Sequence, residues 1–197
     1  MNINIKYLVV GVVGIILGIM ITPWFSADYM DYRQAAVMMN QNIDRHFIEE
    51  MIPHHEGAIT MAGLALERSK RSEILSLAKD IIEAQKRENE QMRDWYTDWF
   101  GGEPGNSSNM GVMMGHGGIG MQMMGMEGDI DALKSAEDFD LEFISQMIPH
   151  HEMAIMMARM LTASTDRQEM KTLADNIITS QSKEIEMMRS WYKVWSK

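Results

Sequence analysis

The chain has 197 residues and a net charge of −10, with 18 Lys and Arg against 28 Asp and Glu. Its length suits one domain of ordinary size or two small ones, and its 46% apolar content is enough for a packed core. The acidic balance argues against nucleic-acid binding, and the lack of cysteine excludes disulfide frameworks, thiolate metal sites and cysteine nucleophiles. Methionine is unusually abundant, with 23 copies, and its thioether either packs in a core or binds soft metal ions.

The N-terminal segment predicts export. From Tyr7 to Ala27 no residue is charged, and the run is long enough to cross a bilayer as a helix. Lys6 precedes it and Asp28 follows it, an order that keeps the N-terminus cytoplasmic and exports the rest. We expect residues 1–27 to be a signal peptide or a membrane anchor. The remainder is expected to work in a periplasm or a thylakoid lumen, either anchored to the membrane or secreted.

The remainder contains an internal repeat at an offset of 96 residues. Asp44 to Ala62 aligns with Asp140 to Ala158, and Glu73 to Trp99 aligns with Glu169 to Trp195. In each copy, apolar residues recur at three- and four-residue steps along two segments, which predicts an amphipathic helical hairpin. Two such hairpins bury their stripes in an antiparallel four-helix bundle, an all-α fold. The predicted boundaries are 28–99 for the first hairpin, 100–133 for a linker and 134–197 for the second hairpin, with 28–197 as one domain.

The predicted linker is rich in glycine and methionine. Ten of the 15 glycines fall between Gly101 and Gly128, where no helical period is present. Apolar side chains in such a segment have no core to fill, whereas an ordinary flexible linker is built from serine or charged residues. We therefore interpret the thioethers and the imidazole of this segment as soft-metal ligands. They are Met113, Met114, His116, Met121, Met123, Met124 and Met126.

A histidine pair follows a proline in the first helix of each copy. Methionines lie one and two turns away on the same helices, and others lie on the inward stripe of the second helices. Neutral imidazole and thioether together suit Cu(I), and Ag(I) as its mimic, because both ions are soft and accept low coordination numbers. Adjacent histidines point about 100° apart around the helix axis, so we expect ligands from different helices, or from one pair and the linker. The bundle candidates are His54, His55, His150, His151, Met51, Met147, Met61, Met157, Met92 and Met188.

Other interpretations of these residues are open. Each methionine could serve packing alone, and each histidine could be a hydrogen-bonded core residue. Glu88 and Glu184, on the inward stripe of the second helices, are expected to be hydrogen-bond partners of the site or surface charges. The di-iron signature is absent, because Met51 and Met147 stand where it needs glutamate, three residues before histidine. Four tryptophans are expected to close one end of the bundle, namely Trp95, Trp99, Trp191 and Trp195.

The doubled MIPHHE motif resembles a ferritin-like family catalogued as a domain of unknown function. The resemblance extends from Asp44 to Trp195, because each motif is followed by a helix with Gln, Glu, Met-Arg and Trp at matching steps. It implies an exported copper-binding protein that protects cells by sequestering Cu(I), with Ag(I) also accepted. It also implies that the two histidine pairs are the ligands, with a methionine before each. His46, which aligns with Glu142, departs from the repeat and is a candidate only.

The function predicted from these features is non-enzymatic binding of copper that contributes to copper resistance. Cu(II) is a further candidate ion. One alternative is a methionine-rich interaction protein, and another is a chaperone that delivers copper to a partner such as an efflux system or a sensor. A cuproenzyme would need an open site that cycles between redox states. The partners expected are copper ions and, through the N-terminal segment, a membrane.

Overall fold

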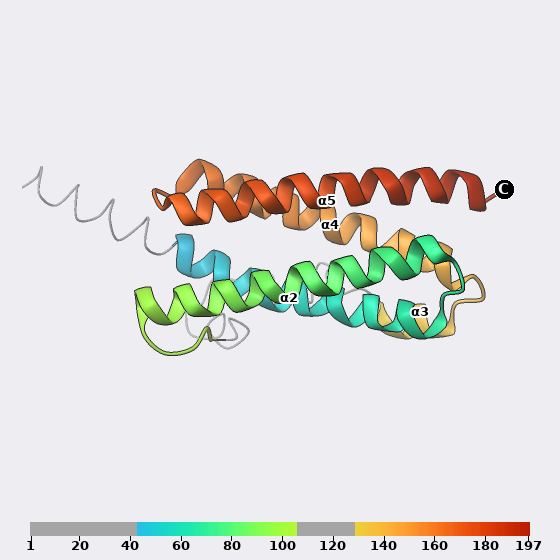
Figure 1. Cartoon of the computed structure of the whole chain (residues 1–197), viewed down its shortest axis with the longest axis horizontal. Coiled ribbons are helices and arrows are strands. Elements are labelled where there is room, and N and C mark those ends of the chain that lie inside the picture. The colour runs from blue at the N-terminus through green and yellow to red at the C-terminus, as the bar shows by residue number, and fades with distance from the viewer. Residues whose placement is uncertain (1–42, 106–128) are drawn as a thin grey trace, which may run out of the picture. The chain divides into compact units, whose positions relative to one another are not determined.

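The computed structural model describes residues 43–105 and 129–197, and every regular element in these residues is a helix (Figure 1). The predicted all-α four-helix bundle is confirmed. Residues 43–68 form the first long helix. The remaining helices are α2 (Ser72–Phe100), the short α3 (Ile130–Ser135), α4 (Phe139–Ser164) and α5 (Gln168–Trp195).

Two predicted segments fall largely or wholly outside the described residues. The signal or anchor segment, residues 1–27, is one of them. Residues 106–128, which contain all the metal-ligand candidates of the linker, are the other. Among the helices that are described, none combines the length and apolarity needed to span a membrane.

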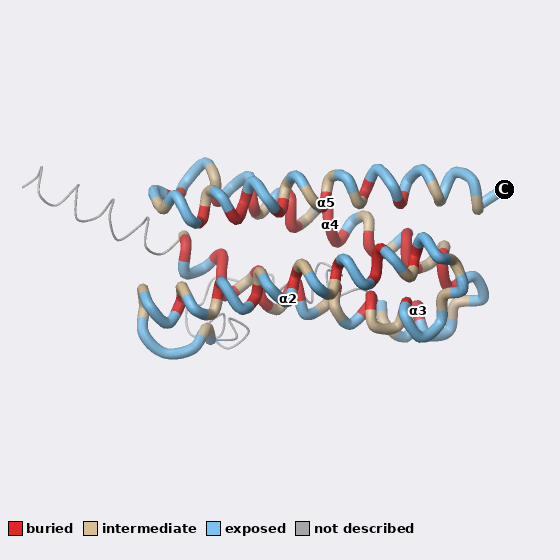
Figure 2. Tube along the Cα trace, in the orientation of Figure 1, coloured by how far each residue is buried: buried red, intermediate tan, exposed pale blue. Residues whose placement is uncertain are grey.

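The long helices form because their apolar residues recur at helical spacing and their interiors suit a helix. Figure 2 shows buried positions recurring along one side of each. Neither α2 nor α5 contains glycine or proline, so nothing breaks them before their ends. α2 stops at Gly101, whose φ of 75° is readily reached by glycine and costly for other residues. The N-cap of α4 is Asp138, whose side chain accepts a hydrogen bond from the backbone N–H of Leu141.

Pro53 and Pro149 lie inside the first helix of each hairpin. A proline in this position removes one backbone hydrogen bond and crowds the carbonyl four residues earlier. Both helices nevertheless continue without a break through their prolines. The histidine pairs therefore lie on continuous helices that each lack one backbone hydrogen bond just before the pair.

The two hairpins hold each other through matching contacts at their turns. Arg71, in the turn of the first hairpin, donates from Nε to Oδ2 of Asp140 at 3.0 Å and lies 4.1 Å from the ring centre of Trp195. The same contacts recur in the other direction, with Arg167 Nε 3.2 Å from Asp44 Oδ2 and its guanidinium 4.0 Å from the ring centre of Trp99. Each turn therefore packs against the start and the end of the other hairpin, which makes the hairpins antiparallel.

The apolar core is divided into two clusters, one near each turn. The first cluster combines the turn end of the first hairpin with the beginning of α4 and the end of α5, and the second reverses these roles. Trp191 and Trp195 stack at 5.7 Å and pack on the first cluster, whereas Trp95 and Trp99 stack at 5.4 Å and pack on the second. The expectation that all four tryptophans close one end was wrong. Because the hairpins are antiparallel, one tryptophan pair lies at each end of the bundle.

The short helix α3 is not among the elements that the sequence predicts. Its N-cap, Asp129, accepts a hydrogen bond from the backbone N–H of Ala132 at 2.8 Å. Leu133 is fully buried in the first core cluster, and Arg68 of the first long helix donates to the Leu133 carbonyl at 3.1 Å. This short helix thus docks the chain just before α4 onto the first hairpin.

Candidate metal centre

A layer of buried polar residues separates the two apolar clusters. In the first long helix it lies between Ile52 of the second cluster and Ala58 of the first, and the other three long helices show the same change. Polar groups at this depth are costly unless they find hydrogen-bond or metal partners. The buried members are His54, His55, Gln85, Asn89, His150, His151 and Gln181.

His54 and His150 meet at the centre of this layer. Their ring centroids are 3.8 Å apart with the planes tilted by 41°, and each residue is only 4% exposed. None of their four ring nitrogens has a hydrogen-bond partner. Burial, reinforced by the neighbouring histidines, lowers the pKa of His150 to about 3 and the pKa of His54 well below its usual value. Both imidazoles are therefore neutral near pH 7 and offer free lone pairs.

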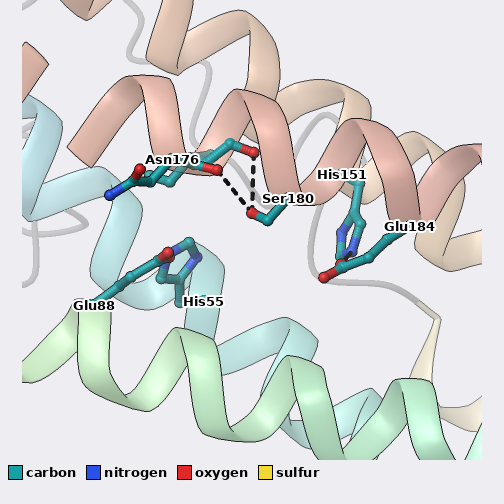
Figure 3. Close-up of polar contacts among 7 residues, drawn as sticks. His55, Glu88, His151, Asn176, Ser180 and Glu184 are labelled. Carbon is teal, nitrogen blue, oxygen red and sulfur yellow. Dashed lines mark hydrogen bonds and ion pairs between the residues drawn. The ribbon is translucent and has the colours of Figure 1, made fainter. Parts of the chain in front are cut away.

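The outer two histidines each pair with a glutamate of the second helix of the same hairpin. His55 Nε2 lies 2.8 Å from Glu88 Oε2, and His151 Nε2 lies 2.6 Å from Glu184 Oε2 (Figure 3). Because a carboxylate only accepts, Nε2 carries the proton in these bonds and Nδ1 of a neutral ring keeps its lone pair. Both Nδ1 atoms are buried without a partner. Of the two roles expected for Glu88 and Glu184, the structure shows the first, hydrogen bonding to the histidine pairs.

The six candidate methionines of the bundle divide into two symmetric sets, one on each side of the histidine layer. Met147, Met188 and Met61 belong to the first apolar cluster, and all three are fully buried. Met51 and Met92 belong to the second cluster, against which Met157 packs while half-buried. Each set contains methionines from both hairpins. Thioethers of both hairpins therefore lie in the apolar cluster on each side of the layer.

Three buried amides complete the layer, and the sequence analysis did not assign them to the site. The side-chain oxygens of Gln85, Gln181 and Asn89 are buried with no hydrogen-bond partner. Gln85 and Gln181 occupy matching positions of the repeat, whereas Asn89 aligns with Ile185. A polar residue repeated on an otherwise apolar stripe was the signal that could have identified the two glutamines.

The geometry limits which donors can share an ion. Within residues 43–105 and 129–197, no three His, Asp or Glu side chains lie close enough together to hold a metal ion. The rings of His54 and His55 are 6.4 Å apart and point in different directions, so the four histidines do not form one cluster. A metal bound here would combine one or two imidazoles with thioethers, a donor set that suits a soft monovalent ion.

The remaining candidates do not join this layer. His46 is exposed on the first long helix, away from the buried histidines. The linker candidates lie outside the described residues, and they are Met113, Met114, His116, Met121, Met123, Met124 and Met126. Within the described residues, the candidate ligands are therefore the histidine layer and the two methionine sets that flank it.

Removing the carboxylate partner of a buried histidine should weaken metal binding. We expect Glu88→Ala and Glu184→Ala each to lower Cu(I) affinity by about 10- to 100-fold, because the histidine loses the group that orients its ring. A titration against a competing Cu(I) chelator measures this change. Glu90→Ala, on the exposed side of α2, is the matched control and should bind like the parent. Equal affinity in all four proteins would show that the carboxylates have no part in metal binding.

Comparison with known proteins places the chain in a family. The family described as Domain of unknown function (DUF305) matches residues 44–192. The chain belongs to this family. CopM in its Cu(II)-bound form is 47% identical to this DUF305 chain, with a TM-score of 0.68 over 77% of this chain and 97% of CopM. CopM in its Cu(I)-bound form is 44% identical, with a TM-score of 0.66 over 78% of this chain and 98% of CopM.

More distant relatives share the fold or a shorter stretch of sequence. A DUF305 fragment from Deinococcus radiodurans is 29% identical, with a TM-score of 0.58 over 77% of this chain and 95% of the fragment. The uncharacterized protein L153 of Acanthamoeba polyphaga mimivirus is 43% identical over 51 residues. That match covers 26% of this chain and 34% of L153, so the chain spans about a third of the length of this relative.

Proposed function

We propose that this protein is an exported, non-enzymatic copper-binding protein that sequesters Cu(I) and contributes to copper resistance. The observation that carries the proposal is the contact of His54 with His150 in the bundle centre, with four ring nitrogens unpartnered and buried methionines on both sides. CopM, which has Cu(I)-, Cu(II)- and Ag-bound forms, is similar along nearly its whole length and supports the choice of ion.

The donor set favours a monovalent soft ion over harder competitors. The imidazoles of His54 and His150 are neutral at pH 7, so they lose no proton when they bind a metal ion. Thioethers are uncharged and soft, so they bind divalent ions weakly. Burial keeps water from the ion, which also suits Cu(I) and Ag(I) because they accept few ligands. Cu(II) is a further candidate ion, which exposed carboxylate and imidazole groups such as His46 would bind better than the layer would.

Metal titration tests the binding part of this proposal. We expect the protein without residues 1–27 to bind more than one Cu(I) in the presence of reductant, because the ligand sets occur twice in the bundle and again in the linker. Native mass spectrometry counts the bound ions. Replacing His54, His55, His150 and His151 together by Gln should lower the number bound and the affinity of the tightest site. A spectrum with at most one ion at saturation, unchanged by the substitutions, would contradict the proposal.

Deletion of the N-terminal segment tests the compartment. The uncharged run from Tyr7 to Ala27 is the feature that supports export. Cells that produce the protein without residues 1–27 should lose protection against copper, although the purified truncated protein binds Cu(I) like the full chain. Equal protection by both forms would mean that the protein acts in the cytoplasm.

A further inference from the structure

The second hairpin carries exposed methionines that the described part of the first hairpin, residues 43–100, lacks. Met156 and Met160 of α4 are 47% and 59% exposed, among the most exposed large apolar side chains of the described residues. The matching positions of the first hairpin are Thr60 and Leu64. Because the same helical hairpin folds without thioethers at these two positions, packing of the bundle does not require them.

Both methionines line one groove on the outside of the second hairpin. The groove lies between α4 and α5 and has a volume of about 640 Å³. Ile155 and Ile185 contribute to its apolar lining. Two arginines and two glutamates border it, and one pair, Arg189 with Glu152, forms an ion pair at 2.5 Å. The charged border is therefore neutral overall and does not repel a cation.

The spacing of the two thioethers allows them to share one ion. Residues four apart on a helix are neighbours on its surface, with Cβ atoms about 5–6 Å apart. The methionine side chain has three rotatable bonds, so both sulfurs can turn toward a point between them. Two thioethers in a neutral, partly apolar groove are donors for a soft monovalent ion and poor donors for hydrated divalent ions.

We propose that Met156 and Met160 form a second, solvent-accessible binding site for Cu(I) or Ag(I) in the groove between α4 and α5. This inference rests on the proposed function, because it gives the same protein an accessible site besides the buried one. The histidines of α4 are buried in the layer, whereas this pair is open to solvent. An ion can therefore reach the groove without any opening of the bundle, and the groove is suited to capture and exchange.

Methyl NMR of methionine in the full chain tests the groove directly. Ag(I), added as its nitrate, is the probe, and the signals of Met156 and Met160 are assigned by substitution with leucine. We expect both methyl signals to shift together and to saturate at one ion. The double variant Met156→Leu, Met160→Leu should bind one ion fewer in native mass spectra. Met187→Leu is the matched control, since Met187 is 42% exposed on α5 but does not line the groove.

The variant with all four buried histidines replaced by Gln separates this inference from the proposed function. Shifts of Met156 and Met160 that persist in this variant support an independent groove site, even if the buried methionines no longer respond. Shifts of Met51 and Met147 in the parent, without any at Met156 and Met160, would overturn the groove site and leave the proposed function intact. A loss of one ion in the Met187 control would also overturn it, because any exposed methionine would then suffice.

Discussion

Replacing His54 and His150 together by Leu is expected to stabilise the metal-free protein and to abolish its tightest metal binding. Four buried ring nitrogens without partners would be removed from the core, and leucine has a similar volume to histidine. We expect the free energy of unfolding at pH 7 to rise by about 1–3 kcal/mol. Cu(I) affinity should fall by about 100-fold or more, because both central imidazoles are lost.

Chemical denaturation of metal-free parent and variant measures the stability change, and a chelator competition measures the affinity. His46→Leu is the control, since His46 is exposed and its replacement should change neither quantity much. A variant that is less stable than the parent would indicate that the two histidines are satisfied core residues. A gain in stability together with a loss of Cu(I) binding would indicate that His54 and His150 serve metal binding and not the stability of the core.

The metal-free protein is expected to lose stability as the pH falls from about 6.5 toward 3. The pKa of His150 is lowered to about 3 and that of His54 lies well below its usual value, mainly because both rings are buried. Between about pH 3 and pH 6.5, these two histidines bind protons in the unfolded chain but not in the folded chain. Stability therefore increases with pH in this window and is fully present above it, with a slope approaching about 1.4 kcal/mol per pH unit for each histidine.

Unfolding curves at several pH values test this expectation by comparing the parent with the His54→Leu, His150→Leu variant. Burial raises the pKa of Asp44, which opposes the trend at low pH, but this contribution is the same in both proteins and cancels in their difference. The variant should show the shallower loss of stability on acidification. Parallel curves would mean that His54 and His150 are protonated as readily in the folded bundle as in the unfolded chain.

Much of the fold could be predicted because the repeat and the helical period are local properties of the sequence. The stripe from Ile74 to Met92 defines the inward face of α2 without reference to the other hairpin. The glutamate partners could also be predicted, since Glu88 and Glu184 lie on that face in both copies. These features depend only on spacing along one helix or within one hairpin.

The features that depend on how the hairpins pair could not be predicted in the same way. The contact of His54 with His150, and the separation of the tryptophans into two stacks, follow from the antiparallel packing of one hairpin on the other. The repeat alone is equally compatible with other arrangements of the two hairpins. Burial also decides which methionines are accessible, and for this reason the exposed pair Met156 and Met160 was not among the candidates.

X-ray absorption at the copper edge tests whether the buried histidine layer and its methionines together hold Cu(I). The protein is loaded with a single equivalent of Cu(I) under reductant, so that the tightest site dominates the spectrum. We expect a first coordination shell with both imidazole nitrogen and thioether sulfur, and a loss of the nitrogen scattering in the His54→Leu, His150→Leu variant. A shell of sulfur alone in the parent protein would contradict this expectation and assign the first ion to methionines outside the layer.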